Sequence, residues 1–156
     1  MSSATERARR GLVLFATLSG LAIVACGDDS TPPEPEPEVA TIRVTVGTFT
    51  TDVPYPTGSH TPIPLVVNQQ NAITFQFLGA NGQPEPIIVA ERANLELRMS
   101  NMATGWTFTP TGGTGATFTA NMRPTATGSF IPLLQLFNSE HGHNEVDRTI
   151  SVTVTQ

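Results

Sequence analysis

The stretch Thr41-Ile42-Arg43-Val44-Thr45-Val46 alternates between aliphatic and polar side chains. Successive side chains of a β-strand point to opposite faces of a sheet, so this alternation predicts a strand with one buried and one exposed face. Thr, Val, Ile and Phe, which favour strands, are abundant in the chain that follows. Residues 41–46 therefore supply the pattern by which the other elements are recognised.

The same period of two recurs in later segments, and turn residues separate them. The segments are residues 72–78, 95–99, 106–108, 116–119, 129–137 and 149–154. Glycine, proline or asparagine marks turns at residues 79–84, 103–105, 111–113 and 124–128. About seven short strands, with turns roughly every 8–15 residues, predict an all-β fold, a single antiparallel β-sandwich over residues 40–156.

No capped amphipathic helix of adequate length is apparent in this region. The best helical candidate is residues 89–95. It is short, and Leu95, Leu97 and Met99 continue it with the alternation of a strand. We therefore expect a strand there.

The first 25 residues have the organisation of a targeting segment. Three arginines lie within residues 5–10, and an apolar run of fourteen residues follows at 11–24. This run is too short for a comfortable membrane span, which needs about 20 residues. Residues 1–25 are therefore predicted to be a signal peptide that is removed.

The end of that run, Ile23-Val24-Ala25-Cys26-Gly27, resembles the bacterial lipobox. The resemblance implies a bacterial lipoprotein, cut before Cys26 and carrying a diacylglyceryl thioether and often a further acyl chain such as palmitate on its amine. Each buried methylene contributes about 0.8 kcal/mol, so several chains make a durable membrane anchor. The implied location is the extracytoplasmic side of the cell envelope, and Gly27 after the cysteine favours the outer membrane over the inner.

Residues 26–39 are predicted to be a disordered linker between this cysteine and the domain. Proline and glutamate alternate from Pro33 to Glu38. That composition favours extended polyproline II backbone and self-repulsion. The segment should act as a semi-rigid spacer that holds the domain away from the membrane.

The charge of the domain excludes several classes of partner. All eight basic residues are arginine, and three of them lie in the leader. Residues 40–156 carry five arginines against seven acidic residues, which leaves no basic patch for nucleic acid or for anionic lipid head groups. Cys26 is the only cysteine, so an intramolecular disulfide is excluded.

The strand layout resembles the bacterial immunoglobulin-like domains of surface proteins. Residues 42–46 resemble their opening strand, residues 68–84 a hairpin around a glycine-centred turn, and residues 149–153 the closing strand. The immunoglobulin-type cysteine pair is absent. A cupredoxin-like sandwich would show similar strands, so the topology stays open between these two.

The candidate for chemistry is a histidine pair, His141 and His143, between two predicted strands. Residues two apart in extended backbone point the same way, and Gly142 lets the chain bend between them. Both imidazoles could then bind one divalent cation. Further ligands would come from Glu140, Glu145, Asp147 or the distant His60. Imidazole with carboxylate suits Zn²⁺ or Cu²⁺.

Two other interpretations of these residues stay open. The histidine pair also fits a solvated polar turn without a metal. Met99, Met102 and Met122 could extend the site toward Cu(I), although methionine at strand positions is typical of a core.

The sequence contains no recognisable catalytic pattern. There is no nucleophile elbow, and the glycine-rich residues 112–115 join strand-like runs without a helix start that could bind phosphate. We therefore expect no enzymatic activity and no catalytic residue, and a binding or structural role in the cell envelope. The alternatives are a Zn- or Cu-binding module and an accessory subunit of an envelope complex with a protein partner.

Overall fold

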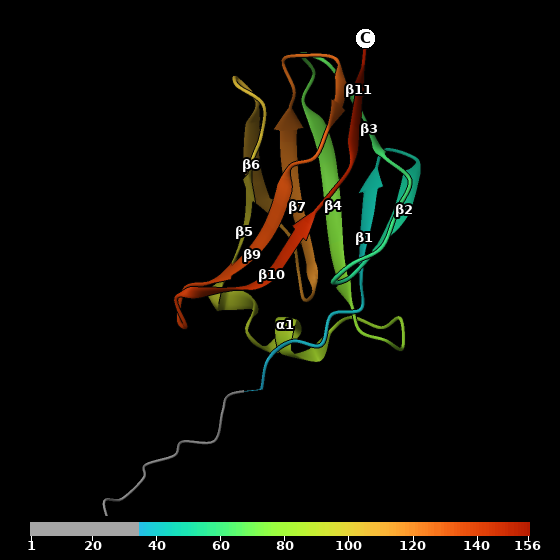
Figure 1. The fold of residues 1–156 in the computed structure, drawn as a ribbon. Coiled ribbons are helices and arrows are strands. Elements are labelled where there is room, and N and C mark those ends of the chain that lie inside the picture. The colour runs from blue at the N-terminus through green and yellow to red at the C-terminus, as the bar shows by residue number, and fades with distance from the viewer. Residues whose placement is uncertain (1–34) are drawn as a thin grey trace, which may run out of the picture. The chain divides into compact units, whose positions relative to one another are not determined.

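The alternating stretch at residues 41–46 forms the first strand, and the chain continues as strands almost to its end (Figure 1). The computed structural model describes residues 35–156, so the expected signal peptide, Cys26 and most of the linker lie outside the described residues. The strands are β1 (Thr41–Val46), β2 (Phe49–Pro54), β3 (Ile63–Val66), β4 (Asn71–Leu78), β5 (Leu95–Ser100), β6 (Thr107–Gly112), β7 (Thr117–Arg123), β8 (Gly128–Phe130), β9 (Leu133–Asn138), β10 (His143–Thr149) and β11 (Val152–Thr155). The prediction of an all-β fold is confirmed.

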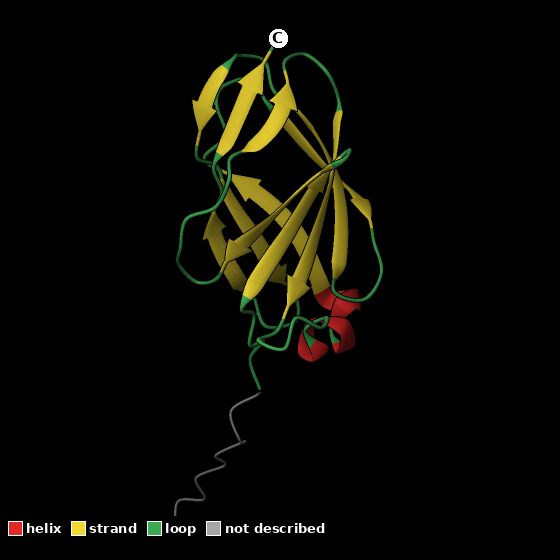
Figure 2. Cartoon of the chain, turned by 90° about the vertical axis from the view of Figure 1, so that its right-hand side faces the viewer, coloured by secondary structure: helices red, strands yellow, loops and turns green. Residues whose placement is uncertain are grey.

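These strands form three sheets, seen in Figure 2. The largest has the order β2-β1-β4-β7-β6 and is antiparallel throughout. A second, also antiparallel, has the order β10-β9-β5. The third has the order β3-β11-β8, in which β3 and β11 run parallel.

One hydrophobic core holds the sheets together as a β-sandwich. In β1, Ile42 and Val44 are fully buried while Arg43 between them is exposed, as the alternation predicts. Buried apolar side chains from all three sheets belong to one cluster. Two aromatic rings in it, Phe77 and Phe118, meet edge to face at 5.5 Å between centroids, a favourable geometry for aromatic pairs.

The structure has more strands than the sequence pattern indicated. In β2 the inward residues are Thr51 and Val53, and because Thr51 is polar the strand lacks the alternation of apolar and polar side chains. Strand β3 contains Pro64, which is tolerated because β3 is an edge strand that pairs only with β11. The run 129–137, expected as one strand, is divided into β8 and β9.

A short helical segment precedes β5, so the expectation of a strand in place of the helical candidate at residues 89–95 is wrong for the part before Leu95. The helical segment itself lies slightly earlier than that candidate. It consists of α1 (Pro86–Ala90) and a 3₁₀ turn, η1 (Arg92–Asn94). The Glu85 carboxylate accepts a 2.8 Å hydrogen bond from the Ile88 backbone and so caps α1. Strand β5 then begins at Leu95, as predicted. Within residues 35–156 no helix is long and apolar enough to cross a membrane. The likeness to immunoglobulin-like domains stays a prediction.

Candidate metal centre

The site is built on the hairpin that joins β9 to β10. Asn138 ends β9, His143 begins β10, and the two residues pair directly across the ladder. The Gly142 amide closes the tip by donating a 2.9 Å hydrogen bond to the Asn138 carbonyl. Gly142 has a φ of 74°, in the left-handed region that suits glycine. The tip therefore turns sharply and returns His143 to the sheet beside Asn138.

A β-bulge in β10 directs Glu145 inward. The register shifts between Asn144 and Val146, so Glu145 is the extra residue of β10 at that point. Glu145 and Val146 are consecutive and both buried, which breaks the alternation of a regular strand. Bulges commonly re-aim a side chain in this way near functional sites. The Glu145 side chain is only 2% exposed as a result.

Two imidazoles meet this buried carboxylate. Oxygen Oε1 of Glu145 lies 3.3 Å from Nδ1 of His141 and 3.4 Å from Nε2 of His143. The two rings stack with centroids 5.6 Å apart and planes 26° from parallel. The His141 side chain is 18% exposed and that of His143 is 48% exposed, so the cluster opens to solvent on the His143 side.

The arrangement could hold a metal ion. One ligand atom from each of His141, His143 and Glu145 lies within 4.8 Å of the others. Ligand atoms at tetrahedral angles around Zn²⁺ lie roughly 3.3–3.4 Å apart, given bonds of about 2.0–2.1 Å. Both nitrogen–oxygen distances, 3.3 and 3.4 Å, match that spacing, so two of the three ligand pairs need little rearrangement to bind the ion.

The structure does not bring His60 to this cluster. Its Nε2 accepts a hydrogen bond from the Ser151 amide at 3.0 Å, which leaves the ring proton on Nδ1 to donate to the Thr61 carbonyl at 2.9 Å. Ser151 follows the end of β10, whereas His143 begins that strand, so about 20 Å of strand separates the two places. Figure 1 shows the β9–β10 turn and β11 at opposite ends of the domain. His60 therefore links the loop before β3 to Ser151, the residue that precedes β11.

The two other candidate carboxylates have different partners. Glu140 accepts a hydrogen bond from the Asn94 side chain of η1, which ties the hairpin tip to the helical segment. Asp147 accepts hydrogen bonds from Gln135 at 2.9 Å and from Asn144 at 3.1 Å. Of the acidic residues considered in the sequence, Glu145 is the one that meets both imidazoles.

The three candidate methionines also lie away from the cluster, and Met102 lines a hollow together with Met99 and Phe108. Met122 is fully buried in the core on β7. Met99 pairs with Leu134, four residues along β5 from the Leu95–Asn138 pair, a separation of about 13 Å. The cluster of His141, His143 and Glu145 therefore offers nitrogen and oxygen donors, which favour Zn²⁺ or Cu²⁺ over Cu(I).

Two residues that lie beside the cluster, Asn138 and Glu91, were not identified from the sequence. Asn138 is fully buried, and its amide nitrogen lies 2.9 Å from a carboxylate oxygen of Glu91 and 2.9 Å from Oε1 of Glu145. A signal for Asn138 does exist, because it continues the inward positions of Leu134 and Leu136 with a polar side chain. Glu91 gives no such signal, since only the tertiary fold brings the end of α1 to the hairpin.

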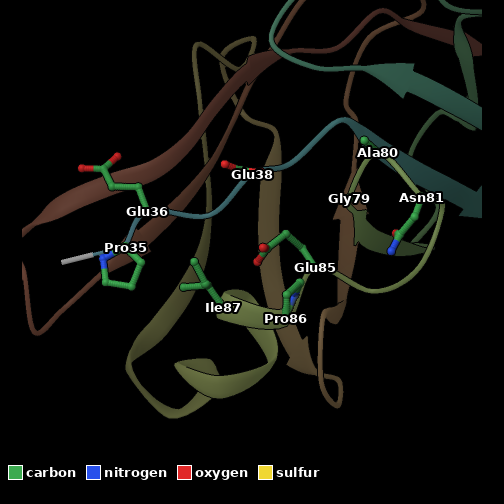
Figure 3. A pocket seen from close by; sticks show the side chains of 9 residues that line it. All are labelled: Pro35, Glu36, Glu38, Gly79, Ala80, Asn81, Glu85, Pro86 and Ile87. Carbon is green, nitrogen blue, oxygen red and sulfur yellow. The ribbon is translucent and has the colours of Figure 1, made fainter. Parts of the chain in front are cut away.

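A separate hollow of about 530 Å³ lies at the other end of α1 (Figure 3). Residues 35–38 pass over the start of the helix there, and the lining includes Glu36, Glu38 and Glu85. Its lining shares no residue with the imidazole cluster. The Glu85 carboxylate is already used in capping α1, which gives this residue a structural role.

Comparison with known proteins adds no relative: no family model matches the chain, and no curated protein matches it significantly.

Proposed function

We propose that this chain is a lipid-anchored β-sandwich protein of the bacterial cell envelope that binds one divalent transition metal ion, Zn²⁺ or Cu²⁺, through His141, His143 and Glu145. The observation that carries the metal-binding part is the buried carboxylate of Glu145 between two imidazoles. Buried charges in proteins are paired or coordinate metals. Here the carboxylate lies against two imidazoles, which are metal-ligating groups, and accepts a hydrogen bond from the Asn138 amide.

The location rests on the leader. The lipobox-like residues 23–27 and the proline-glutamate linker after them support an anchored protein whose domain stands off the membrane. A site on an exposed hairpin would then be accessible to ions in the envelope. The proposed role is metal binding without catalysis by the domain itself.

Isothermal titration of the purified full chain with Zn²⁺, and separately with Cu²⁺, tests the metal-binding part. One ion per chain is expected, and the double variant His141→Ala/His143→Ala should lose binding. His60→Ala is the matched control, because it removes a histidine that lies outside the cluster, and it should bind as wild type does. Equal binding by the double variant would refute the site.

A further inference from the structure

The metal centre has a buried amide at its base. Asn138 is the last residue of β9 and follows the inward-facing Leu134 and Leu136. Its side chain is fully buried. A buried amide must satisfy its donors and acceptors within the protein, so the contacts of Asn138 fix what surrounds it.

The orientation of this amide follows from its backbone partners. The side-chain oxygen Oδ1 lies 3.0 Å from the amide nitrogen of Glu140 and 3.4 Å from that of His141. Backbone N–H groups only donate, so the oxygen must face them. The amide nitrogen Nδ2 of Asn138 therefore faces the opposite way.

On that opposite side Nδ2 meets the cluster. It donates to Oε1 of Glu145 at 2.9 Å and to Oε2 of Glu91 at 2.9 Å, and it lies 3.1 Å from Nδ1 of His141. One end of the amide thus holds the backbone of the tip, including that of His141, while the two hydrogens at the other end are donated to Glu145 and Glu91.

We infer that Asn138 is the positioning residue of the metal centre: its amide nitrogen orients Glu145, its side-chain oxygen holds the backbone of His141, and Glu91 anchors the amide from the end of α1. This inference rests on the proposed metal binding. Hydrogen bonds to ligating side chains orient them, and their removal typically lowers metal affinity by about 10–100-fold. Asn138 acts through the ligands and does not itself bind the ion.

The test compares Co²⁺ binding by the full chain and by Asn138→Ala. Co²⁺ serves as the probe because its visible absorption bands report the coordination geometry. We expect the variant to bind about 10–100-fold more weakly. Its absorption bands should also change in position or intensity, which a purely structural loss of stability would not produce in the fraction that binds.

Asn144→Ala is the matched control. This asparagine lies in the same hairpin, between two of the ligands, but its side chain contacts Asp147. The control should keep the wild-type affinity and spectrum. An equal loss in Asn144→Ala would overturn the inference, because any change in the hairpin would then have the same effect.

The outcomes separate the two proposals. Absence of Co²⁺ and Zn²⁺ binding by wild type overturns the proposed function and this inference with it. Tight wild-type binding, with the same affinity and spectrum in Asn138→Ala, overturns the inference alone.

If Asn138→Ala does not fold, an NMR titration of the wild-type chain still tests the inference. The side-chain NH₂ resonances of Asn138, followed by NMR, should shift on addition of one equivalent of Zn²⁺. They should shift more than those of Asn121 on β7. Resonances of Asn138 that do not respond would overturn the inference.

Discussion

The imidazoles of His141 and His143 stack at 5.6 Å and reach the same oxygen of Glu145. Two features of the backbone produce this relationship. Gly142, with its positive φ, turns the chain between the two rings, and the bulge at Glu145 brings the carboxylate inward. The hairpin itself assembles the donors, so changes in its backbone should affect metal binding.

Gly142→Ala should weaken metal binding and slightly destabilise the domain. An added Cβ would meet nothing within 4 Å, so the cost comes from the left-handed backbone alone. That cost is about 1 kcal/mol for a residue with a side chain. Thermal unfolding and Zn²⁺ titration of the same sample measure the two effects.

Gly47→Ala is the matched control for that variant. Gly47 also has a positive φ and open space around an added Cβ, but it lies in the β1–β2 turn. It should lose similar stability and keep full Zn²⁺ affinity. Equal loss of affinity in both variants would mean that the hairpin tip has no special part in binding.

Zn²⁺ should raise the unfolding temperature of the full chain, and a chelator should reverse the effect. A ligand at 100 times its Kd stabilises the folded state by about 2.7 kcal/mol. Glu145→Gln should abolish most of this shift because it removes the buried carboxylate. Asp147→Asn, an exposed acid of the same hairpin, should leave it intact, and a shift that persists in Glu145→Gln would exclude Glu145 as a ligand.

The pair of Arg43 and Asp52 should make stability depend on pH at the acid end. Arg43 donates to both carboxylate oxygens of Asp52, at 2.8 and 3.0 Å, and these hydrogen bonds hold the pKa of Asp52 below its ordinary value. A lowered pKa in the folded state contributes stability above the unfolded pKa, near 4, and that contribution is lost as the pH falls through the folded value. The effect should be small, since both side chains are about half exposed.

Asp52→Asn isolates that contribution. Urea unfolding at about pH 6 and about pH 3 should show a smaller decrease in stability for the variant than for wild type. Identical decreases in the two proteins would show that the Arg43–Asp52 pair contributes nothing to the loss of stability in acid.

Cys26→Ser should release the protein from membranes. The lipobox-like residues predict that the thiol carries the lipid, and a hydroxyl cannot form the thioether. Fractionation of cells that express each form, with labelled palmitate as a second readout, measures the change. Unchanged membrane association without any label would refute the lipoprotein prediction.

The all-β fold could be predicted because local alternation and burial agree. Ile42 and Val44 are inward in the pattern and inward in the structure. Strand β2 was not predicted, because its inward residue Thr51 is polar and hydrophobic periodicity therefore gives no signal there. Strand pairing, including the parallel β3–β11 pair, depends on contacts between distant segments that one sequence does not reveal.

The candidate site could be predicted only where local backbone geometry determines it. His141 and His143 are two residues apart, so their proximity follows from local geometry. The choice of Glu145 over Glu140 depends on the bulge, which depends on pairing with β9. The position of His60 depends on its hydrogen bond with Ser151, 91 residues away in the chain.

Diffraction at the zinc absorption edge tests the central claim most directly. Crystals of the chain grown with one equivalent of Zn²⁺ should show a single strong anomalous peak at the β9–β10 hairpin. The peak should lie about 2.0–2.1 Å from one nitrogen of His141 and one of His143, and within bonding distance of a Glu145 oxygen. A peak elsewhere, or no peak in crystals where the hairpin is well ordered, would contradict the account.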